Sequence, residues 1–155
     1  MSELVFKNFE LTRHFFLKHV EAYNEAMVDV QPVGFNNTIH WHVGHVLTVA
    51  EQFMFGFPNK STSLPAHYME LFATRTKPAD WQGEVPAVQE LTSQLREQLN
   101  RIKEIPAEAL NERLKQPFLG CETFGELTNF AIFHEANHLG QIHAMKRVIE
   151  AAGSK

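Results

Sequence analysis

Apolar residues recur along this chain at the spacing of amphipathic helices. They fall three or four positions apart over long stretches, and no stretch shows the strict alternation of β-branched residues that is typical of strands. The periodicity predicts four long helices, which cover about residues 3–27, 37–55, 84–105 and 123–151. An all-α protein is therefore expected.

Turn and capping residues set the expected ends of these helices. Asn36 or Asn37 is expected to cap the second helix, because a side-chain oxygen there can accept a hydrogen bond from a free backbone N–H. Gly56 ends that helix. Thr123 and Glu126 are three residues apart, which is the capping-box pattern, and predict the start of the fourth helix.

Residues 57–83 form a long irregular connection between the second and third helices, with a short helix expected within residues 67–74. Phe72 and Trp81 are candidates either to cover a binding site or to anchor this connection. Residues 107–115 are expected to form one or two further helical turns. Four long helices and one long crossover predict an all-α four-helix bundle.

The composition fits a single domain over residues 1–155. The net charge of −4, with basic residues scattered among acidic ones, argues against a nucleic-acid-binding surface.

The N-terminus lacks the basic and apolar regions of a signal peptide, and no window approaches the roughly 20 apolar residues of a membrane span. The one cysteine, Cys121, has no partner for an internal disulfide and is expected to be a small core residue. We therefore expect a cytoplasmic protein that binds neither nucleic acid nor membrane.

Histidine is frequent, and five of the nine histidines lie in two short segments. His134 and His138 are four residues apart, so their imidazoles lie on one face of the fourth helix. That face is otherwise apolar, which places them at or near the bundle core, whereas His143 is expected to be exposed. A single buried histidine is usually a hydrogen-bonded core residue, but several together need a shared reason, which a divalent metal supplies. The same face carries Leu127, Ala131, Ile142, Met145 and Ile149.

The second helix carries a further inward histidine. His45 lies beside Gly44, whose missing side chain permits a neighbouring helix or ligand to approach closely. His42 lies about 60° from His45 around the helix and is a second-choice ligand, whereas His40 points well away. Trp41, one turn before His45, is the one candidate substrate-binding residue, although an aromatic at this position is also typical of a core.

His134 to His138 also read H-E-x-x-H, the pattern of zinc peptidases, in which the glutamate acts as general base. The further residues of the extended zinc-peptidase motif are missing from this chain. Gly140 comes one residue too early, and Ala144 occupies the position of the third ligand in the extended motif. Glu135 is turned about 100° from His134, which favours a surface position or a role beside the ligands. A peptidase is therefore disfavoured.

Two motifs resemble those of the DinB-like metal-binding bundles. Residues 37–46, NTIHWHVGHV, look like the second-helix motif of that family, and residues 133–142, FHEANHLGQI, look like its fourth-helix motif. The resemblance covers nearly the whole chain in order and spacing. It implies an up-down-down-up four-helix bundle in which His45, His134 and His138 bind a divalent metal.

The resemblance also implies partners. The family is similar to thiol S-transferases that use bacillithiol or mycothiol, and many of its members are dimeric. Many others have no assigned activity, and the family name, which refers to DNA damage, does not indicate DNA binding. The expected partners are therefore a low-molecular-weight thiol, a small electrophile and a second copy of the chain in a homodimer.

The chemistry of such a site is compatible with several functions. Three neutral imidazoles leave the charge of the metal uncompensated and coordination positions open, which is typical of a catalytic site. A site of this kind activates water or holds a thiol as its thiolate. We expect a metal-dependent thiol S-transferase; the alternatives are a small metal-dependent hydrolase and a non-catalytic metal- or ligand-binding bundle. Zn²⁺ or Ni²⁺ is the expected metal, with Fe²⁺ and Mn²⁺ as alternatives.

Overall fold

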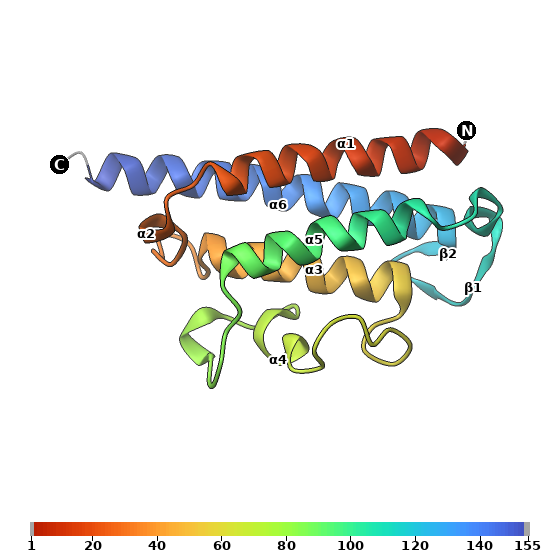
Figure 1. The fold of residues 1–155 in the computed structure, drawn as a ribbon, viewed down its shortest axis with the longest axis horizontal. Helices are drawn as coiled ribbons and strands as arrows, with labels where there is room; N and C mark the ends of the chain where they lie inside the picture. Colours follow the sequence, from red (N-terminus) through yellow and green to blue (C-terminus); the bar gives the residue numbers. More distant parts are fainter. Residues whose placement is uncertain (1, 154–155) are drawn as a thin grey trace.

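The computed structural model describes residues 2–153 and confirms an all-α four-helix bundle (Figure 1). Its long helices are α1 (Ser2–Glu21), α3 (Ile39–Phe55), α5 (Val88–Lys103) and α6 (Phe124–Gly153). α1 and α6 run in one direction and α3 and α5 in the other, which is the expected up-down-down-up order. α5 and α6 each contact both α1 and α3, so the four helices surround one core.

Shorter elements occupy the connections between the long helices. They are α2 (Glu25–Val28), α4 (Tyr68–Phe72) and two 3₁₀ turns, η1 (Pro78–Asp80) and η2 (Ala107–Asn111). α4 confirms the short helix predicted in the crossover. α1 ends at Glu21, earlier than predicted, because the side chain of Asn24 accepts a hydrogen bond from Ala26 N (2.9 Å) and so caps the separate helix α2.

The cap of α3 differs from the predicted one. Thr38, rather than Asn36 or Asn37, caps α3, because its Oγ1 accepts a hydrogen bond from Trp41 N (3.1 Å). All three residues are of types that cap helices, so the local sequence does not choose among them.

The capping box at α6 is confirmed. Thr123 Oγ1 accepts a hydrogen bond from Glu126 N (3.2 Å), and Glu126 Oε2 accepts one from Thr123 N (3.0 Å). The same carboxylate also accepts a hydrogen bond from Glu122 N (2.6 Å). The backbone N–H groups of Glu122, Thr123 and Glu126 thus all have hydrogen-bond acceptors, as expected of a capping box.

A hairpin lies just before α6. Its strands, β1 (Arg113–Phe118) and β2 (Cys121–Thr123), pair antiparallel, so the predicted helical turns are wrong for residues 113–115. Leu119 and Gly120 form the turn with positive φ angles of 52° and 81°. β1 is almost entirely exposed and therefore lacks the apolar alternation by which a strand is recognised in a sequence.

His40 points away from the other histidines, as predicted, and joins three segments. Its Nδ1 lies 2.7 Å from Asp29 Oδ1, and its Nε2 lies 2.8 Å from the carbonyl oxygen of Pro86. The contact to Pro86 anchors the chain before α5. α5 consequently begins at Val88, after the predicted start near Glu84.

A buried ion pair connects α1 to α6. Arg13 Nε donates to Glu135 Oε1 (2.6 Å) and its Nη2 donates to Glu135 Oε2 (2.9 Å), and both side chains are essentially inaccessible to solvent. Arg13 Nη1 also donates to the carbonyl oxygen of Leu95 in α5 (2.8 Å). The expectation that Glu135 lies at the surface or beside the metal ligands is therefore wrong. Its partner, Arg13, lies 122 positions away in the sequence.

The polar network continues from this ion pair into α5 and α3. Gln98 Oε1 accepts a hydrogen bond from Arg13 (3.1 Å), and Gln98 Nε2 donates to Glu51 Oε2 (2.7 Å). Arg101 donates to both oxygens of Glu51 (2.8 and 3.0 Å), and Ser61 donates to one of them (2.5 Å). Burial alone would raise the pKa of Glu51, but these hydrogen bonds lower it overall. The network thus joins all four long helices through charges that have partners.

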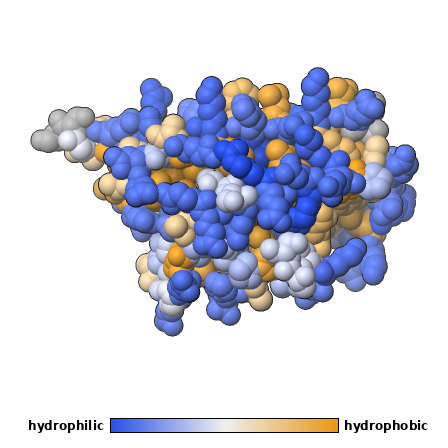
Figure 2. All heavy atoms as spheres, viewed as in Figure 1, coloured by the Kyte–Doolittle hydropathy of each residue, from blue (hydrophilic) through white to orange (hydrophobic). Residues whose placement is uncertain are grey.

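Apolar side chains fill the rest of the core. α3 is buried on nearly all sides, because α5, α6 and the crossover that carries α4 cover it. Figure 2 shows a largely hydrophilic face on which hydrophobic residues form only small groups. Within residues 2–153, none of the helices combines the length and apolar character that crossing a lipid bilayer would require. The largest fully buried apolar residues are Phe9, Phe16, Ile39, Leu47, Phe72, Leu91, Leu95, Ile102, Ile142 and Met145.

Replacing Gly44 by alanine is expected to destabilise the protein by about 1–3 kcal/mol, the usual effect of overfilling a packed core. A Cβ at this position would lie 2.3 Å from the ring of Phe72, which is fully buried and cannot move freely. Urea unfolding of the two proteins measures the difference. Gly140→Ala is the control, because a Cβ there would contact nothing within 4 Å. Equal losses in both variants would contradict the expectation.

Candidate metal centre

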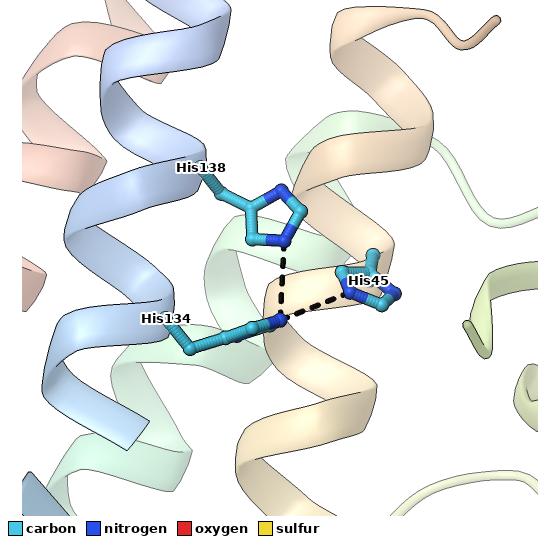
Figure 3. Close-up of side chains that lie close together, drawn as sticks. All are labelled: His45, His134 and His138. Atoms are coloured by element: carbon cyan, nitrogen blue, oxygen red, sulfur yellow. Dashed lines mark hydrogen bonds between the residues drawn. The ribbon is translucent and has the colours of Figure 1, made fainter. Parts of the chain in front are cut away.

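Three histidines from two facing helices meet inside the bundle (Figure 3). His45 comes from α3, and His134 and His138 come from α6. The Nε2 atom of His134 lies 3.1 Å from that of His45 and 3.1 Å from that of His138. One ligand atom from each of the three lies within 4.8 Å of the others. His45 and His138 are buried, and His134 is partly exposed.

These distances fit a divalent metal. Nitrogens bound at about 2.0–2.1 Å to one tetrahedral ion lie about 3.3 Å apart. The two shorter separations here are 3.1 Å. Three imidazole nitrogens can form a metal site with a coordination position left open. The three-histidine group could therefore bind a metal, as the spacing of His134 and His138 predicts.

The outer ring nitrogen of His45 contacts a backbone carbonyl. His45 Nδ1 lies 2.7 Å from the carbonyl oxygen of Phe72, at the end of α4. A carbonyl can only accept, so Nδ1 carries the hydrogen and the Nε2 lone pair points toward the other two histidines. Orientation of a ligand histidine by such a partner is common in metal sites. The crossover therefore fixes the orientation of this ring.

His42 contacts the three-histidine group but does not belong to it. Its Nδ1 lies 2.7 Å from Nδ1 of His138, on the side of that ring opposite the three converging nitrogens. One of these two nitrogens must donate to the other. When His138 donates, its Nε2 lone pair is free for a metal. His42, predicted as a second-choice ligand, is thus placed to orient His138.

Burial keeps these imidazoles uncharged. Desolvation, followed by the nearby His45 and His42, lowers the pKa of His134 to about 4. Desolvation, with His134 as the next cause, lowers the pKa of His138 to about 2. The pKa of His45 is also lowered by desolvation, although its hydrogen bond to Phe72 acts in the opposite direction. Neutral imidazole is the form that binds metals, so the three-histidine group could bind one at neutral pH.

Acid is expected to destabilise the metal-free protein between about pH 6.5 and pH 4. An unfolded histidine takes up a proton near pH 6.5, whereas His134 and His42 in the folded protein have pKa values of about 4. The unfolded state binds more protons in this range, so stability falls as the pH falls, by up to about 1.4 kcal/mol per pH unit for each such histidine. Urea unfolding at several pH values in the presence of a chelator measures the slope.

His134→Gln is the matched variant for this pH dependence. It removes one of the histidines whose pKa is lowered and should make the slope of stability against pH shallower. An exposed histidine such as His14 serves as the control, and His14→Gln should leave the slope unchanged. A slope that is the same in all three proteins would contradict the expectation.

The remaining predicted residues lie around the histidines. Trp41 stacks on the ring of His45, with centroids 4.4 Å apart and planes 14° from parallel, and its Nε1 donates to Thr76 Oγ1 (2.9 Å). Trp81 Nε1 donates to the carbonyl oxygen of Leu71 (2.8 Å) and so anchors the crossover. Cys121 is buried, as predicted. His143 is exposed and lies outside the cluster, also as predicted.

A pocket of about 370 Å³ opens onto the histidines. Its walls follow α3 and α6, which run antiparallel here. His42, early in α3, lies beside His138, with ring centroids 5.0 Å apart, and Phe53, late in α3, lies beside Phe130, with centroids 5.9 Å apart. None of the described residues that line it is an aspartate or a glutamate. One end, the apolar end, is lined by Val49, Phe53, Leu119 and Phe130, and the other, the polar end, is lined by Asn37, Thr74, Arg75 and Gln141.

Several residues that complete this site were not predicted from the sequence. The carbonyl oxygen of Phe72 carries no sequence signal, because every residue has one. Arg75 and Leu119 lie in loops without a motif. A signal for His42 was available in its position one turn before His45, but only the placement of α6 shows that it contacts His138.

Comparison with known proteins gives the same fold. The family profile described as the DinB superfamily matches residues 8–142. The crystal structure of a conserved protein from Enterococcus faecalis has a TM-score of 0.67 to this chain and covers 97% of it, and the similarity covers 98% of that protein at 15% identity. This likeness concerns the fold alone. No curated protein sequence matches the chain. Since the profile spans most of the chain and includes the three clustered histidines, this protein belongs to the DinB superfamily.

Proposed function

We propose that this protein is a metal-dependent thiol S-transferase whose metal is held by His45, His134 and His138. The observation that carries the proposal is the pocket: neutral imidazoles converge in it, and no carboxylate is present among the described residues that line it. Metal-dependent hydrolysis commonly uses a carboxylate beside the metal as general base, as in H-E-x-x-H enzymes. Here Glu135 is bound to Arg13 in the core instead.

The proposed reaction joins a thiol to an electrophilic carbon. The sulfur–carbon bond forms, the bond from carbon to the leaving group breaks, and the thiol proton is released with that leaving group. A divalent metal bound to three neutral imidazoles supplies the positive charge that stabilises a thiolate, which is the reactive form of a thiol. We expect Zn²⁺ or Ni²⁺ in this role, because imidazole suits these ions. Fe²⁺, which imidazole also suits, and Mn²⁺, which favours oxygen ligands, are the alternatives.

The residues around the histidines would place the two substrates. The apolar end of the pocket, with Phe53 and Phe130, suits an uncharged electrophile and excludes water from it. Trp41, stacked on His45, forms a wall of the pocket and is proposed to contact substrate. The contacts of His45 to Phe72 and of His138 to His42 hold the ligand rings in place before substrate binds.

Thiol transfer is tested directly with metal-loaded protein. Protein loaded with Zn²⁺ or Ni²⁺ is incubated with monochlorobimane and, in separate reactions, bacillithiol, glutathione or cysteine, and fluorescence reports thioether formation. We expect a rate above that of the uncatalysed reaction with at least one thiol, lost in His138→Ala and retained in His143→Ala. No acceleration with any thiol would contradict the proposal. Ester hydrolysis without thiol transfer would favour the hydrolase, and metal binding without either activity would favour a binding protein.

We also propose that the protein forms a homodimer through α1. Leu4, Leu11 and Phe15 are 63%, 53% and 44% exposed and lie on one face of this helix. Hydrophobic residues appear along the edge of the molecule where α1 lies (Figures 1 and 2). Light scattering after size exclusion is expected to give twice the chain mass, with Leu11→Lys shifting the protein to monomer and Val33→Lys, at a loop residue that is 94% exposed, leaving it unchanged. A monomeric wild type would contradict this proposal.

A further inference from the structure

A second pocket adjoins the polar end of the metal pocket. This outer pocket has a volume of about 510 Å³ and shares three lining residues, Asn37, Trp41 and Arg75, with the metal pocket. The two spaces therefore meet at these side chains. Arg75 thus lines both the outer pocket and the pocket that opens onto the histidines.

Arg75 is a cation at this junction. Among residues 2–153 no carboxylate forms an ion pair with it, and none of the described residues that line either pocket is acidic. Lys77 adds a second cation to the outer pocket, and its closest carboxylate, that of Asp80, is 3.9 Å away. The junction thus carries positive charge that the described residues leave mostly uncompensated. An anionic group is the complementary ligand.

The backbone at Arg75 is held in an unusual conformation. Its φ angle of 75° lies in the left-handed region that residues with a Cβ rarely adopt. Thr76 Oγ1 donates to backbone oxygens beside it, those of Leu71 and Ala73, and accepts a hydrogen bond from Trp41 Nε1. Such conformations persist where the surroundings impose them, and they occur often at binding sites. The anchored loop places Arg75 at the pocket in spite of this strain.

Asn37 offers a hydrogen-bond acceptor at the same junction. Its Oδ1 is buried and has no hydrogen-bond partner among the described residues. Asn37 itself lines both pockets. Buried polar atoms in folded proteins nearly always have a partner. A ligand with an N–H or O–H group would supply one here. This observation is independent of the charge and the backbone of Arg75.

We propose that the outer pocket binds the hydrophilic, anionic part of the thiol co-substrate, with a carboxylate-type group on Arg75 and an N–H or O–H group on Asn37. This inference rests on the proposed function, because the sulfur of that molecule would extend toward the three histidines. It assigns the two ends of the site: the polar thiol enters past Arg75, and the electrophile occupies the apolar end beside Phe53 and Phe130. Arg75 is a specificity residue in this arrangement, not a catalytic one.

The test compares thiols that share a chain and a sulfhydryl group but end in either an anionic sulfonate or a neutral hydroxyl. Protein loaded with Co²⁺ is titrated with 3-mercapto-1-propanesulfonate and 3-mercapto-1-propanol, and with the corresponding six-carbon pair, and the sulfur-to-cobalt absorption band reports binding. Sulfonates are used because they share the anionic oxygens of carboxylates but ligate metals poorly. In the wild type, each anionic thiol is expected to bind about tenfold more tightly or better than its alcohol, the usual effect of a charge-assisted hydrogen bond.

Variants of Arg75 test whether this residue causes the tighter binding of anionic thiols. Arg75→Gln is expected to reduce the ratio of affinities to about one and to change the affinity for the neutral thiols less than about twofold. Arg75→Asn, which tolerates the left-handed backbone, should do the same, and its melting temperature checks that the loop still folds. Lys7→Gln removes an equal charge from an exposed position on α1 and should keep the wild-type ratio.

The outcomes separate this inference from the proposed function. A wild-type ratio near one at both chain lengths, or a ratio that survives Arg75→Gln, overturns the role of the outer pocket even if thiols bind the metal. If no absorption band forms with any thiol, calorimetry with hexanesulfonate and hexanol measures the outer pocket alone. A preference for the sulfonate that depends on Arg75 then supports the anion site while contradicting thiol transfer. The absence of that preference overturns the anion site.

Discussion

Replacing Arg13 by methionine is expected to lower the free energy of unfolding by about 3–5 kcal/mol, the usual effect of breaking a buried ion pair from one side. The variant leaves the carboxylate of Glu135 buried without its two charged hydrogen bonds, and it removes the donors to Gln98 and to the backbone of Leu95. A methionine fills much of the arginine volume, so the loss arises from charge and hydrogen bonding rather than from a cavity. Urea unfolding at pH 7 measures it.

Two further proteins show whether the loss comes from the buried charge. Arg13→Met combined with Glu135→Met should recover most of the stability, because an apolar pair can replace a buried ion pair at little cost. Lys103→Met breaks the ion pair with Glu10, in which both side chains are 47% exposed, and should cost less than about 1 kcal/mol. If Arg13→Met costs no more than Lys103→Met, or if the double variant is less stable than both single variants, the explanation is wrong.

Loss of the ligand histidines is the second large effect. The wild-type protein is expected to bind about one equivalent of Zn²⁺ or Ni²⁺ per chain, and His45→Ala, His134→Ala and His138→Ala should each weaken that binding by more than about 100-fold. This loss should exceed that from removing a residue that only orients a ligand, which is typically about 10–100-fold. Elemental analysis after dialysis, and competition with a chromophoric chelator, measure the stoichiometry and the affinity.

Metal binding should also raise the stability of the fold. At a free metal concentration of about 100 times Kd, the gain is about 2.7 kcal/mol, which corresponds to about 5–10 °C in melting temperature for a chain of this size. The gain should vanish in the three ligand variants, because the metal no longer prefers the folded state.

His42 and His143 complete this series. His42→Ala should weaken metal binding by about 10–100-fold, because His138 loses the contact that orients it. His143→Ala should have no effect, because this histidine is exposed and outside the cluster. Equal metal contents in the wild type and in all three ligand variants would contradict the metal site. An effect of His42→Ala as large as that of His138→Ala would mean that His42 is a ligand.

Residues that act locally were predictable from the sequence. His134 and His138 lie four positions apart in one helix, and helical geometry alone places them on one face. Thr123 and Glu126 form their hydrogen bonds within one turn, as the capping box predicts. The apolar spacing identified the four long helices for a similar reason, because each helix must bury one of its faces.

Residues whose partners lie far away in the sequence were not predictable in the same way. Glu135 belongs to an H-E-x-x-H pattern, yet its environment is decided by Arg13, which reaches it only when α1 packs beside α6. The exposed strand β1 carries little apolar alternation, so its pairing with β2 was not visible. In both cases the contact joins two segments of the chain, whereas the spacing of apolar residues gives information about one segment at a time.

Residue spacing was enough to predict the long helices and the two clustered histidines on one of them. These features depend on residue spacing, and spacing is set by the local geometry of the backbone. The tertiary structure confirms that His45 faces them, as its inward position and the family resemblance predicted. The contacts of the Phe72 carbonyl oxygen and of the His42 ring, which orient these histidines, were visible in the tertiary structure alone. It also decided that Arg75 stands at the junction of two pockets. These contacts join α3, α4, α6 and the crossover, and their geometry is defined only once the core has packed.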